Sequence, residues 1–376
     1  MRGLNNSIFI LLLTLFTLHT LFFFSFFSKN RGKSDRGVGT DGRNGYQNMH
    51  LYAPVFHYVS DKFDTPKLSR VFDNDTESNL NERFAREFSN VAKKFGFSTI
   101  LSIGSGNCEI EIDIERIMKT VHAVNTRFFC YDPTEEGHSA ARKSIRSKDN
   151  FVSTRTLPPD VVFSGVFAHH SLHHVSDLNG LVTYVKKNLK PGGVFVVSDM
   201  IGRNGHRRWP EQMELIFKLW NTLPKKSLFD YISNCSVDNY PDYDYSICNG
   251  KVSMTYEGIH SQDVLPVLTN NFHFGKFFAF GGLRFEFVGR RFGNNFDLKN
   301  PAHINFIDKL IQTEESMKSA GHIKPDQFIG TLYHKGFAPP MIYWGNWSPQ
   351  FCLRNTQNTA LDIVRVSDPC LYNCLG

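Results

Sequence analysis

The sequence lacks a basic stripe interleaved with aromatic residues. Its 42 Lys and Arg residues are scattered, and they exceed the 36 Asp and Glu residues by a net charge of only +6. A nucleic-acid-binding domain concentrates positive charge on one face, so we expect no nucleic-acid partner. The chain also lacks the His and Cys spacings of a zinc site and any internal repeat. We therefore predict no metal site and no repeat architecture.

Charge is absent from one long apolar segment near the N-terminus. Residues 7–27 form a run of about 21 residues without charge, which is enough to cross a bilayer core as a helix. A cleaved signal peptide is the alternative, but its apolar region is usually shorter and ends in an A-x-A-like site. No convincing site of that kind follows Ser25. We therefore predict a single-pass signal-anchor transmembrane segment over residues 1–28.

Apolar residues are almost missing from residues 29–50, which are rich in Lys, Arg, Gly, Asp and Asn. This composition predicts a flexible stem that joins no core. Basic residues between Lys29 and Arg36 follow the apolar segment and, by the positive-inside rule, favour a body in the cytosol. The cysteines and the glycosylation sequons favour the opposite orientation.

Cysteine is scarce, with seven residues in the chain. Cys108 and Cys130 fall inside predicted core elements, and we interpret them as buried thiols. The other five lie outside these elements: Cys235, Cys248, Cys352, Cys370 and Cys374. Their peripheral position suits disulfides in an oxidising lumen, and sequons begin at Asn74 and Asn234. We therefore expect a lumenal body in the endoplasmic reticulum or Golgi, with a cytosolic body as the alternative.

Short apolar segments alternate with amphipathic ones between residues 80 and 200. This alternation predicts an α/β fold with a doubly wound, mostly parallel sheet. The expected strands are 100–103, 127–131, 150–155, 163–168 and 194–198, and the expected helices are 78–95, 109–119, 135–146 and 178–189. An antiparallel hairpin over 272–287 is expected to complete the sheet. The domain would span residues 51–300 with a substrate-side insertion at about 203–258, and residues 301–376 would form a helix and an irregular tail.

Glycines break the chain between the first strand and the following helix. Gly104, Ser105 and Gly106 form this turn. Glycine permits a positive φ and a close approach of backbone to a ligand, and the helix start offers free N–H groups. Asp132 ends the neighbouring strand, where a carboxylate can accept hydrogen bonds from both hydroxyls of a ribose. The alternative is that Asp132 only starts the turn at Pro133.

The motifs resemble those of class I S-adenosylmethionine-dependent methyltransferases. They are Ile-Leu-Ser-Ile-Gly-Ser-Gly at 100–106, Tyr131-Asp132, Ser-Leu-His-His at 171–174 and Leu-Lys-Pro-Gly-Gly at 189–193. Blocks at 198–211 and 256–266 look like a bacterial-type subgroup. The resemblance covers roughly residues 80–200 and implies a Rossmann-like, seven-stranded sheet and S-adenosylmethionine as the cofactor. The cofactor-binding residues that it implies are Gly104, Ser105, Gly106, Glu109, Asp132 and Thr156.

The chain departs from the family pattern at three positions. Family members often have an acid at the place of Ser102, which holds the methionine amino group, a third glycine at the place of Cys108, and an Asp near Thr156. We expect Glu109 to replace the missing acid in part. A dinucleotide oxidoreductase would need glycine at 109, and a carboxylate there would repel a pyrophosphate, whereas it tolerates a sulfonium cation.

Histidine is the side chain best suited to accept a proton near neutral pH. The block at residues 169–174 follows the fourth strand at the edge of the sheet where ligands bind. We predict His173, His170, Asp199 and His206 as catalytic residues, with structural packing as the alternative for His173. The function that we expect is O-methylation of a glycan hydroxyl. The alternatives are a lipid or small metabolite at the cytosolic membrane face, and a catalytically degenerate binding module.

Overall fold

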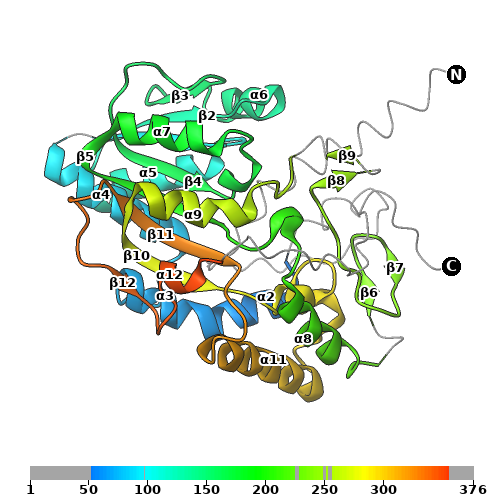
Figure 1. Cartoon of the computed structure of the whole chain (residues 1–376). Helices are drawn as coiled ribbons and strands as arrows, with labels where there is room; N and C mark the ends of the chain where they lie inside the picture. Colours follow the sequence, from blue (N-terminus) through cyan, green and yellow to red (C-terminus); the bar gives the residue numbers. More distant parts are fainter. Residues whose placement is uncertain (1–51, 97, 225–227, 249–250, 253–255, 355–376) are drawn as a thin grey trace, which may run out of the picture.

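Eight strands pair into one sheet in the computed structural model, which describes residues 52–96, 98–224, 228–248, 251–252 and 256–354 (Figure 1). The strand order is β12-β10-β11-β5-β4-β1-β2-β3. The strands are β1 (Thr99–Ile103), β2 (Arg127–Tyr131), β3 (Phe151–Thr154), β4 (Phe163–His169), β5 (Leu189–Met200), β10 (His273–Phe280), β11 (Gln327–Tyr333) and β12 (Ile342–Tyr343). Strands β1 to β5 run parallel, and only β11 is antiparallel to its neighbours. The predicted Rossmann-like, mostly parallel sheet is confirmed.

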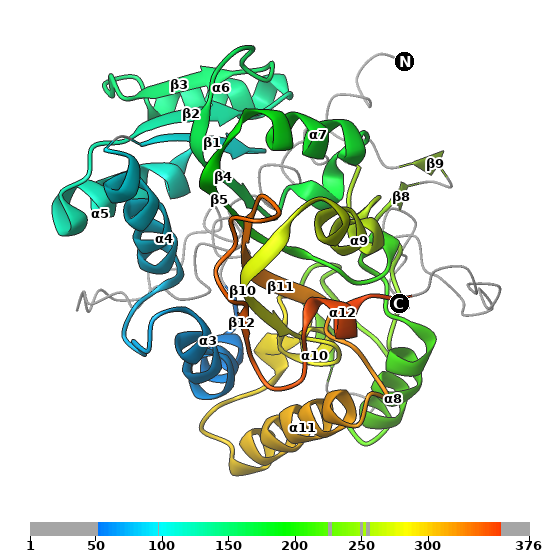
Figure 2. The ribbon, with the colours of Figure 1, turned by 60° about the vertical axis from the view of Figure 1, so that its left-hand side comes forward.

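Helices cover both faces of this sheet. They are α2 (Pro54–Val59), α3 (Thr65–Phe72), α4 (Leu80–Phe95), α5 (Glu109–His122), α6 (Glu135–Ser144), α7 (Leu178–Asn188), α8 (Pro210–Trp220), α9 (Ser261–Asn271), α10 (Phe285–Val288), α11 (Pro301–Ser319) and α12 (Pro349–Cys352). Figure 2 shows α4 and α5 on one side of the sheet and α7 and α9 on the other. The sheet and the helices bury two hydrophobic clusters between them. This packing holds the ends of the strands in place.

Helix α4 forms where the apolar spacing predicts a helix. Its N-cap is Asn79, whose side chain accepts a hydrogen bond from the Glu82 N–H, while the Glu82 carboxylate accepts one from the Asn79 N–H. Gly96 ends the helix with a φ of 73°. Phe84 and Phe88 pack edge-on against Phe167 of β4. The capping box and these aromatic contacts together set where α4 starts and which face it buries.

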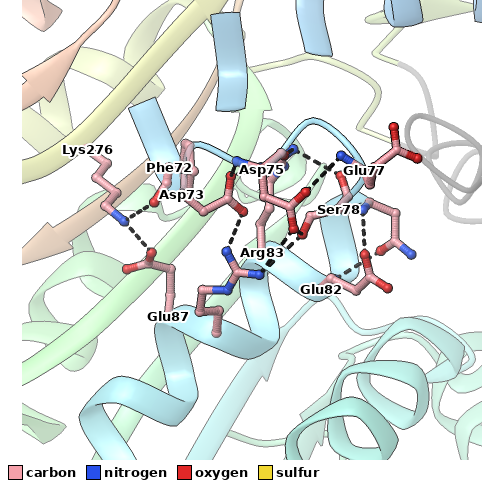
Figure 3. Close-up of polar contacts among 11 residues, drawn as sticks. Phe72, Asp73, Asp75, Glu77, Ser78, Glu82, Arg83, Glu87 and Lys276 are labelled. Atoms are coloured by element: carbon pink, nitrogen blue, oxygen red, sulfur yellow. Dashed lines mark hydrogen bonds and ion pairs between the residues drawn. The ribbon is translucent and has the colours of Figure 1, made fainter. Parts of the chain in front are cut away.

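A buried arginine holds the turn between α3 and α4 (Figure 3). The Arg83 guanidinium is 1% exposed and forms an ion pair with Asp73. It also donates hydrogen bonds to the carbonyls of Asp75, at 2.6 Å, and Ser78, at 3.0 Å. Lys276 of β10 contacts Glu87 of α4 at 2.6 Å. These contacts attach α3 and α4 to the far half of the sheet.

The antiparallel part of the sheet differs from the sequence prediction. The predicted hairpin over 272–287 is wrong, because Gly281 and Gly282, with φ of 77° and 132°, lead the chain from β10 into α10. The antiparallel partner of β10 is β11, which lies between β10 and β5. It comes from the segment for which we expected a helix and an irregular tail. The two-residue β12 makes the sheet eight-stranded instead of seven-stranded.

The inserted segment after β5 contains α8 and two short hairpins, β6 (Phe229–Asp230) with β7 (Cys235–Ser236) and β8 (Ile247–Cys248) with β9 (Lys251–Val252). Figure 1 shows these hairpins beyond the main sheet. The predicted anchor at 1–28 and stem at 29–50 lie outside the described residues. Within the part of the chain that the structure describes, no helix combines the length and apolarity needed to cross a membrane.

Candidate active site

The glycine turn after β1 packs tightly against the loop that follows β4. Gly104 and Gly106 have φ of 64° and 52°. A Cβ atom on Gly104 would lie 2.5 Å from the Cβ of Ser171, so no side chain fits there. The Ser105 N–H donates to the Tyr131 carbonyl at 3.1 Å. The turn is therefore held between the carboxyl ends of β2 and β4, where the sequence predicts it.

Asp132 binds the glycine turn as well as the start of α6. Its Oδ2 accepts a hydrogen bond from the Gly106 N–H at 3.0 Å, and its Oδ1 accepts from the Thr134 N–H at 2.9 Å and hydroxyl at 2.6 Å. A carboxylate offers about four lone-pair sites, so three are used. Without displacing a partner, Asp132 can accept a hydrogen bond from one ribose hydroxyl, whereas we expected it to accept from both.

Cys108 and Cys130 form a disulfide, so the prediction of two buried thiols is wrong. Their Cα atoms lie 6.3 Å apart. Cys130 lies opposite Ser102 across the β1–β2 pair, and the glycine turn brings Cys108 back over this position. Cys108 has a φ of 65°, which suits the glycine that the family often has there. The covalent bond joins the turn to β2.

Two of the five peripheral cysteines can be assigned a bonding state. Cys235 is disulfide-bonded, as expected. Cys352 is a buried free thiol whose pKa burial raises to about 12, so it takes no part in the disulfides expected among the peripheral cysteines, whose odd number leaves at least one thiol unpaired. It is the last residue of α12 and packs in the core; the irregular sequence there did not indicate this helix. The Cys248 side chain, Cys370 and Cys374 lie outside the described residues.

An acidic side chain lies beside Ser102, but it belongs to Glu111. The Ser102 hydroxyl donates a hydrogen bond to Oε1 of Glu111 at 2.5 Å. Glu111 is 3% exposed, and its Oε2 makes no hydrogen bond within the described part of the chain. Burial raises the pKa of Glu111 to about 7, although the Ser102 hydrogen bond acts in the opposite direction. Glu109, the expected replacement, is exposed at the start of α5.

A small pocket, partly open to solvent, lies between Ser102 and the start of α5. Its walls are formed by Ser102, Ile103, Gly104, Ser105, Asn107, Ile110, Glu111 and His169. Thr156 is not among them; it is exposed beyond β3, and its N–H donates to the hydroxyl of Thr154. Sequence reasoning missed Glu111. The available signal was its spacing of three and seven residues from the buried Ile114 and Met118, which places an acid on the apolar face of α5.

His169, the last residue of β4, forms part of the pocket wall. Burial lowers its pKa to about 4, so its imidazole is neutral at pH 7. The predicted His170 comes next, with a φ of 49°, and its ring lies 4.9 Å from the ring of His169 and 6.2 Å from that of His173. Of these three histidines, only His169 lines the pocket.

His173 and Asp199 form a fully buried pair behind the pocket. Nδ1 of His173 lies 2.5 Å from Oδ1 of Asp199. The other Asp199 oxygen accepts hydrogen bonds from the N–H groups of Ser171, at 3.2 Å, and Leu172, at 2.8 Å. Burial opposes ionisation of His173, but the Asp199 carboxylate outweighs it and raises the pKa of the imidazole. Asp199 therefore positions both the loop after β4 and the His173 ring.

His206 joins this pair through Glu257, which the sequence analysis did not select. Nε2 of His206 lies 2.6 Å from Oε1 of Glu257, and Nδ1 of His174 lies 3.8 Å from Oε2. His206 and Tyr256 have φ of 56° and 54°, in a region that non-glycine residues seldom adopt. The structure thus brings three predicted catalytic residues, His173, Asp199 and His206, into one cluster with Glu257 and His174.

The comparisons with known proteins agree with this geometry. Residues 59–229 match the model of a methyltransferase domain family. Together with the sheet and the glycine turn, the match identifies this part of the chain as the class I methyltransferase domain of an enzyme whose cofactor is S-adenosylmethionine. No curated protein sequence matches the chain.

Solved structures similar to this chain include three of low sequence identity. The [4+2]-cyclase SpnF is 14% identical over 70% of this chain and 86% of its own, with a TM-score of 0.35. The plantazolicin methyltransferase BpumL, in complex with SAH, is 13% identical over 87% and 99%, with a TM-score of 0.34. The N-methyltransferase NodS from Bradyrhizobium japonicum, also with SAH, is 10% identical over 78% and 99%, with a TM-score of 0.33.

Proposed function

We propose that this methyltransferase methylates a hydroxyl oxygen of a glycan in the lumen of the secretory pathway, where residues 1–28 anchor it to the membrane. The observation that carries the proposal is the Cys108–Cys130 disulfide beside the cofactor turn. Disulfides persist in oxidising compartments and are rare in the cytosol. The bonded state of Cys235 supports the same compartment. Glycan hydroxyls are abundant acceptors in that lumen, which is why we favour them over cytosolic lipids or metabolites.

The pocket suits the end of S-adenosylmethionine that carries the α-amino group. The buried Oε2 of Glu111 lacks a hydrogen-bond donor among the described residues, and the α-amino cation of the methionine part can supply one. The backbone of Gly104 to Gly106 would hold the middle of the cofactor, and Asp132 would accept one ribose hydroxyl. When bound, the sulfonium supplies an activated methyl group, so the protein's main contribution is alignment.

A neutral imidazole at the pocket wall suits a hydroxyl acceptor. His169 lies at the carboxyl end of β4, and its lowered pKa keeps it unprotonated at pH 7. An unprotonated ring can take the proton that a hydroxyl must lose. General bases typically contribute about 10²–10⁴-fold to the rate, and the lower end is expected for a ring with a lowered pKa. His173 is only 1% exposed. We therefore assign proton acceptance to His169 and loop positioning to the His173–Asp199 pair, in place of the catalytic role predicted for His173.

The test is transfer of labelled methyl from S-adenosylmethionine by the full-length protein into fractionated glycans, lipids and small metabolites. We expect label in glycans, and His169→Gln should lower the transfer rate by about 10²-fold with unchanged affinity for S-adenosylhomocysteine. His322→Gln, an exposed histidine beyond α11, is the control and should transfer normally. Label confined to lipids or metabolites, or full transfer by His169→Gln, would contradict the proposal.

A further inference from the structure

Behind the loop after β4, metal-ligating side chains converge from two segments that are distant in the sequence. One potential ligand atom from each of His173, His174 and Glu257 lies within 4.8 Å of the other two. Nε2 of His173 is 4.0 Å from Oε1 of Glu257, and Nδ1 of His174 is 3.8 Å from Oε2. We propose that these three side chains bind a divalent transition-metal ion of the zinc class.

The orientation of His173 supports a ligand at this position. Its Nδ1 is held by Asp199, which directs Nε2 toward Glu257. That Nε2 is buried and makes no hydrogen bond with any described residue. A buried imidazole nitrogen normally has a partner. In metalloproteins, a carboxylate on one ring nitrogen typically orients the other nitrogen toward the metal.

The donor set indicates the class of ion. Two imidazoles and one carboxylate match the ligands of catalytic zinc and of related transition-metal sites, whereas Mg²⁺ and Ca²⁺ prefer oxygen alone. Tetrahedral bonds of the usual lengths place ligand atoms about 3.3 Å apart. One ligand atom from each residue lies within 4.8 Å of the other two, so each side chain must move by less than about 1 Å to reach this separation. Nδ1 of His174 would give up its 3.3 Å contact with the Tyr256 carbonyl.

The two segments are held together before any ion binds. The Gly205 N–H donates to the Gly258 carbonyl at 2.8 Å, and the His260 N–H donates to the His173 carbonyl at 3.1 Å. Gly258 has a φ of 67°, and a Cβ atom on it would lie 3.0 Å from the backbone nitrogen of His206, so this position favours glycine. Nε2 of His206, 2.6 Å from Oε1 of Glu257, can orient that carboxylate or serve as a fourth ligand.

The proposed site differs from the sequence prediction of no metal site, which rested on the absence of short-range His and Cys spacings. Adjacent histidines at 173 and 174 present no such spacing, and the third ligand follows more than eighty residues later, as the 82-residue separation of His174 from Tyr256 shows. Such a site becomes visible only once the fold brings the segments together.

The test uses full-length protein that has been stripped with a chelator and titrated with Zn²⁺ against a chromophoric competitor. We expect the wild type to bind one equivalent. His173→Gln, His174→Gln and Glu257→Gln should each weaken binding on the order of 100-fold or more, and Asp199→Asn should weaken it by about 10–100-fold through the loss of ring orientation. His260→Gln, a histidine on the same segment that pairs with Asp263 outside the cluster, should bind as the wild type does.

Affinity for S-adenosylhomocysteine, measured in the presence of chelator, reports whether each variant is folded and separates this proposal from the proposed function. Substitution with Co²⁺ gives a second readout in the wild type, because nitrogen and oxygen ligands produce visible absorption bands. The proposal is overturned if the stripped wild type binds no Zn²⁺ at low micromolar concentration. It is also overturned if binding persists at wild-type strength in all three ligand variants.

Discussion

The charge of the cofactor pocket depends on one buried side chain, Glu111. Related enzymes often carry their acid on the first strand, at the place of Ser102; here the carboxyl reaches the same place from α5. Because burial raises its pKa to about 7, the group is half ionised near neutral pH. A ligand with an amino cation binds the ionised form more strongly, and binding should therefore depend on pH.

We predict that affinity for S-adenosylhomocysteine rises with pH through pH 7. With a pKa of about 7, the ionised fraction of Glu111 increases about tenfold between pH 6 and pH 8, and the dissociation constant should fall by a similar factor. Calorimetric titration with S-adenosylhomocysteine at several pH values measures this dissociation constant. Glu111→Gln should bind more weakly and lose this dependence.

Glu109→Gln is the matched control, since Glu109 lies two residues away on the same helix and is exposed. It should keep both the affinity and the pH profile of the wild type. A wild-type profile that is flat between pH 6 and pH 8, or one that shifts equally in both variants, would show that Glu111 does not contact the ligand.

The Arg83 guanidinium stabilises the turn between α3 and α4. We predict that Arg83→Met lowers the free energy of unfolding by about 3–5 kcal/mol, because it leaves the Asp73 carboxylate, 2% exposed, with only the partly exposed Arg86 as an ionic partner. Denaturant unfolding measures the change. Arg116→Met is the control: the Arg116 side chain is 61% exposed and pairs with Asp113 at the surface, and its loss should cost about 1 kcal/mol or less. Equal losses in the two variants would rule out a special role for Arg83.

The disulfide links two elements of the site, the glycine turn and β2. We predict that the double variant Cys108→Ala, Cys130→Ala has a free energy of unfolding about 2–4 kcal/mol lower than that of the wild type, because the disulfide joins residues 22 positions apart. It should also bind S-adenosylhomocysteine more weakly, because the turn is no longer attached. Cys352→Ala, which removes the buried free thiol, tests the effect of losing a cysteine outside the site. Unchanged ligand binding in the double variant would contradict the link to the cofactor turn.

The sequence predicts those elements whose signals are local. Helix α4 follows from the spacing of Leu80, Phe84 and Phe88, and the glycine turn follows from Gly104 and Gly106. Strand β11 was missed because it is buried on both faces over nearly its whole length, so its sequence shows no alternation. Glu257 and the disulfide were missed because each depends on a contact between segments that only the folded sheet brings together.

For the molecule as a whole, the proposed lumenal location determines which reagents can reach the domain. We predict that in sealed microsomes the domain resists added protease and becomes sensitive once detergent is present. Asn74 and Asn234, the sequon residues, are both exposed, so the protein should also lose mass on endoglycosidase treatment. Replacing each with Gln should reduce that loss. Digestion of the domain in intact vesicles would place it in the cytosol and refute the lumenal proposal.

The position of β11 has a consequence for biosynthesis. This strand is translated long after β5 and β10, yet it lies between them and pairs with both. Until residue 333 has left the ribosome, the apolar edge of β5, from Phe195 to Val197, has no neighbour on that side. An unpaired edge of this kind invites pairing with other chains. The nascent enzyme should therefore depend on chaperones late in synthesis, and a stop codon before β11 should produce aggregation instead of a shortened active domain.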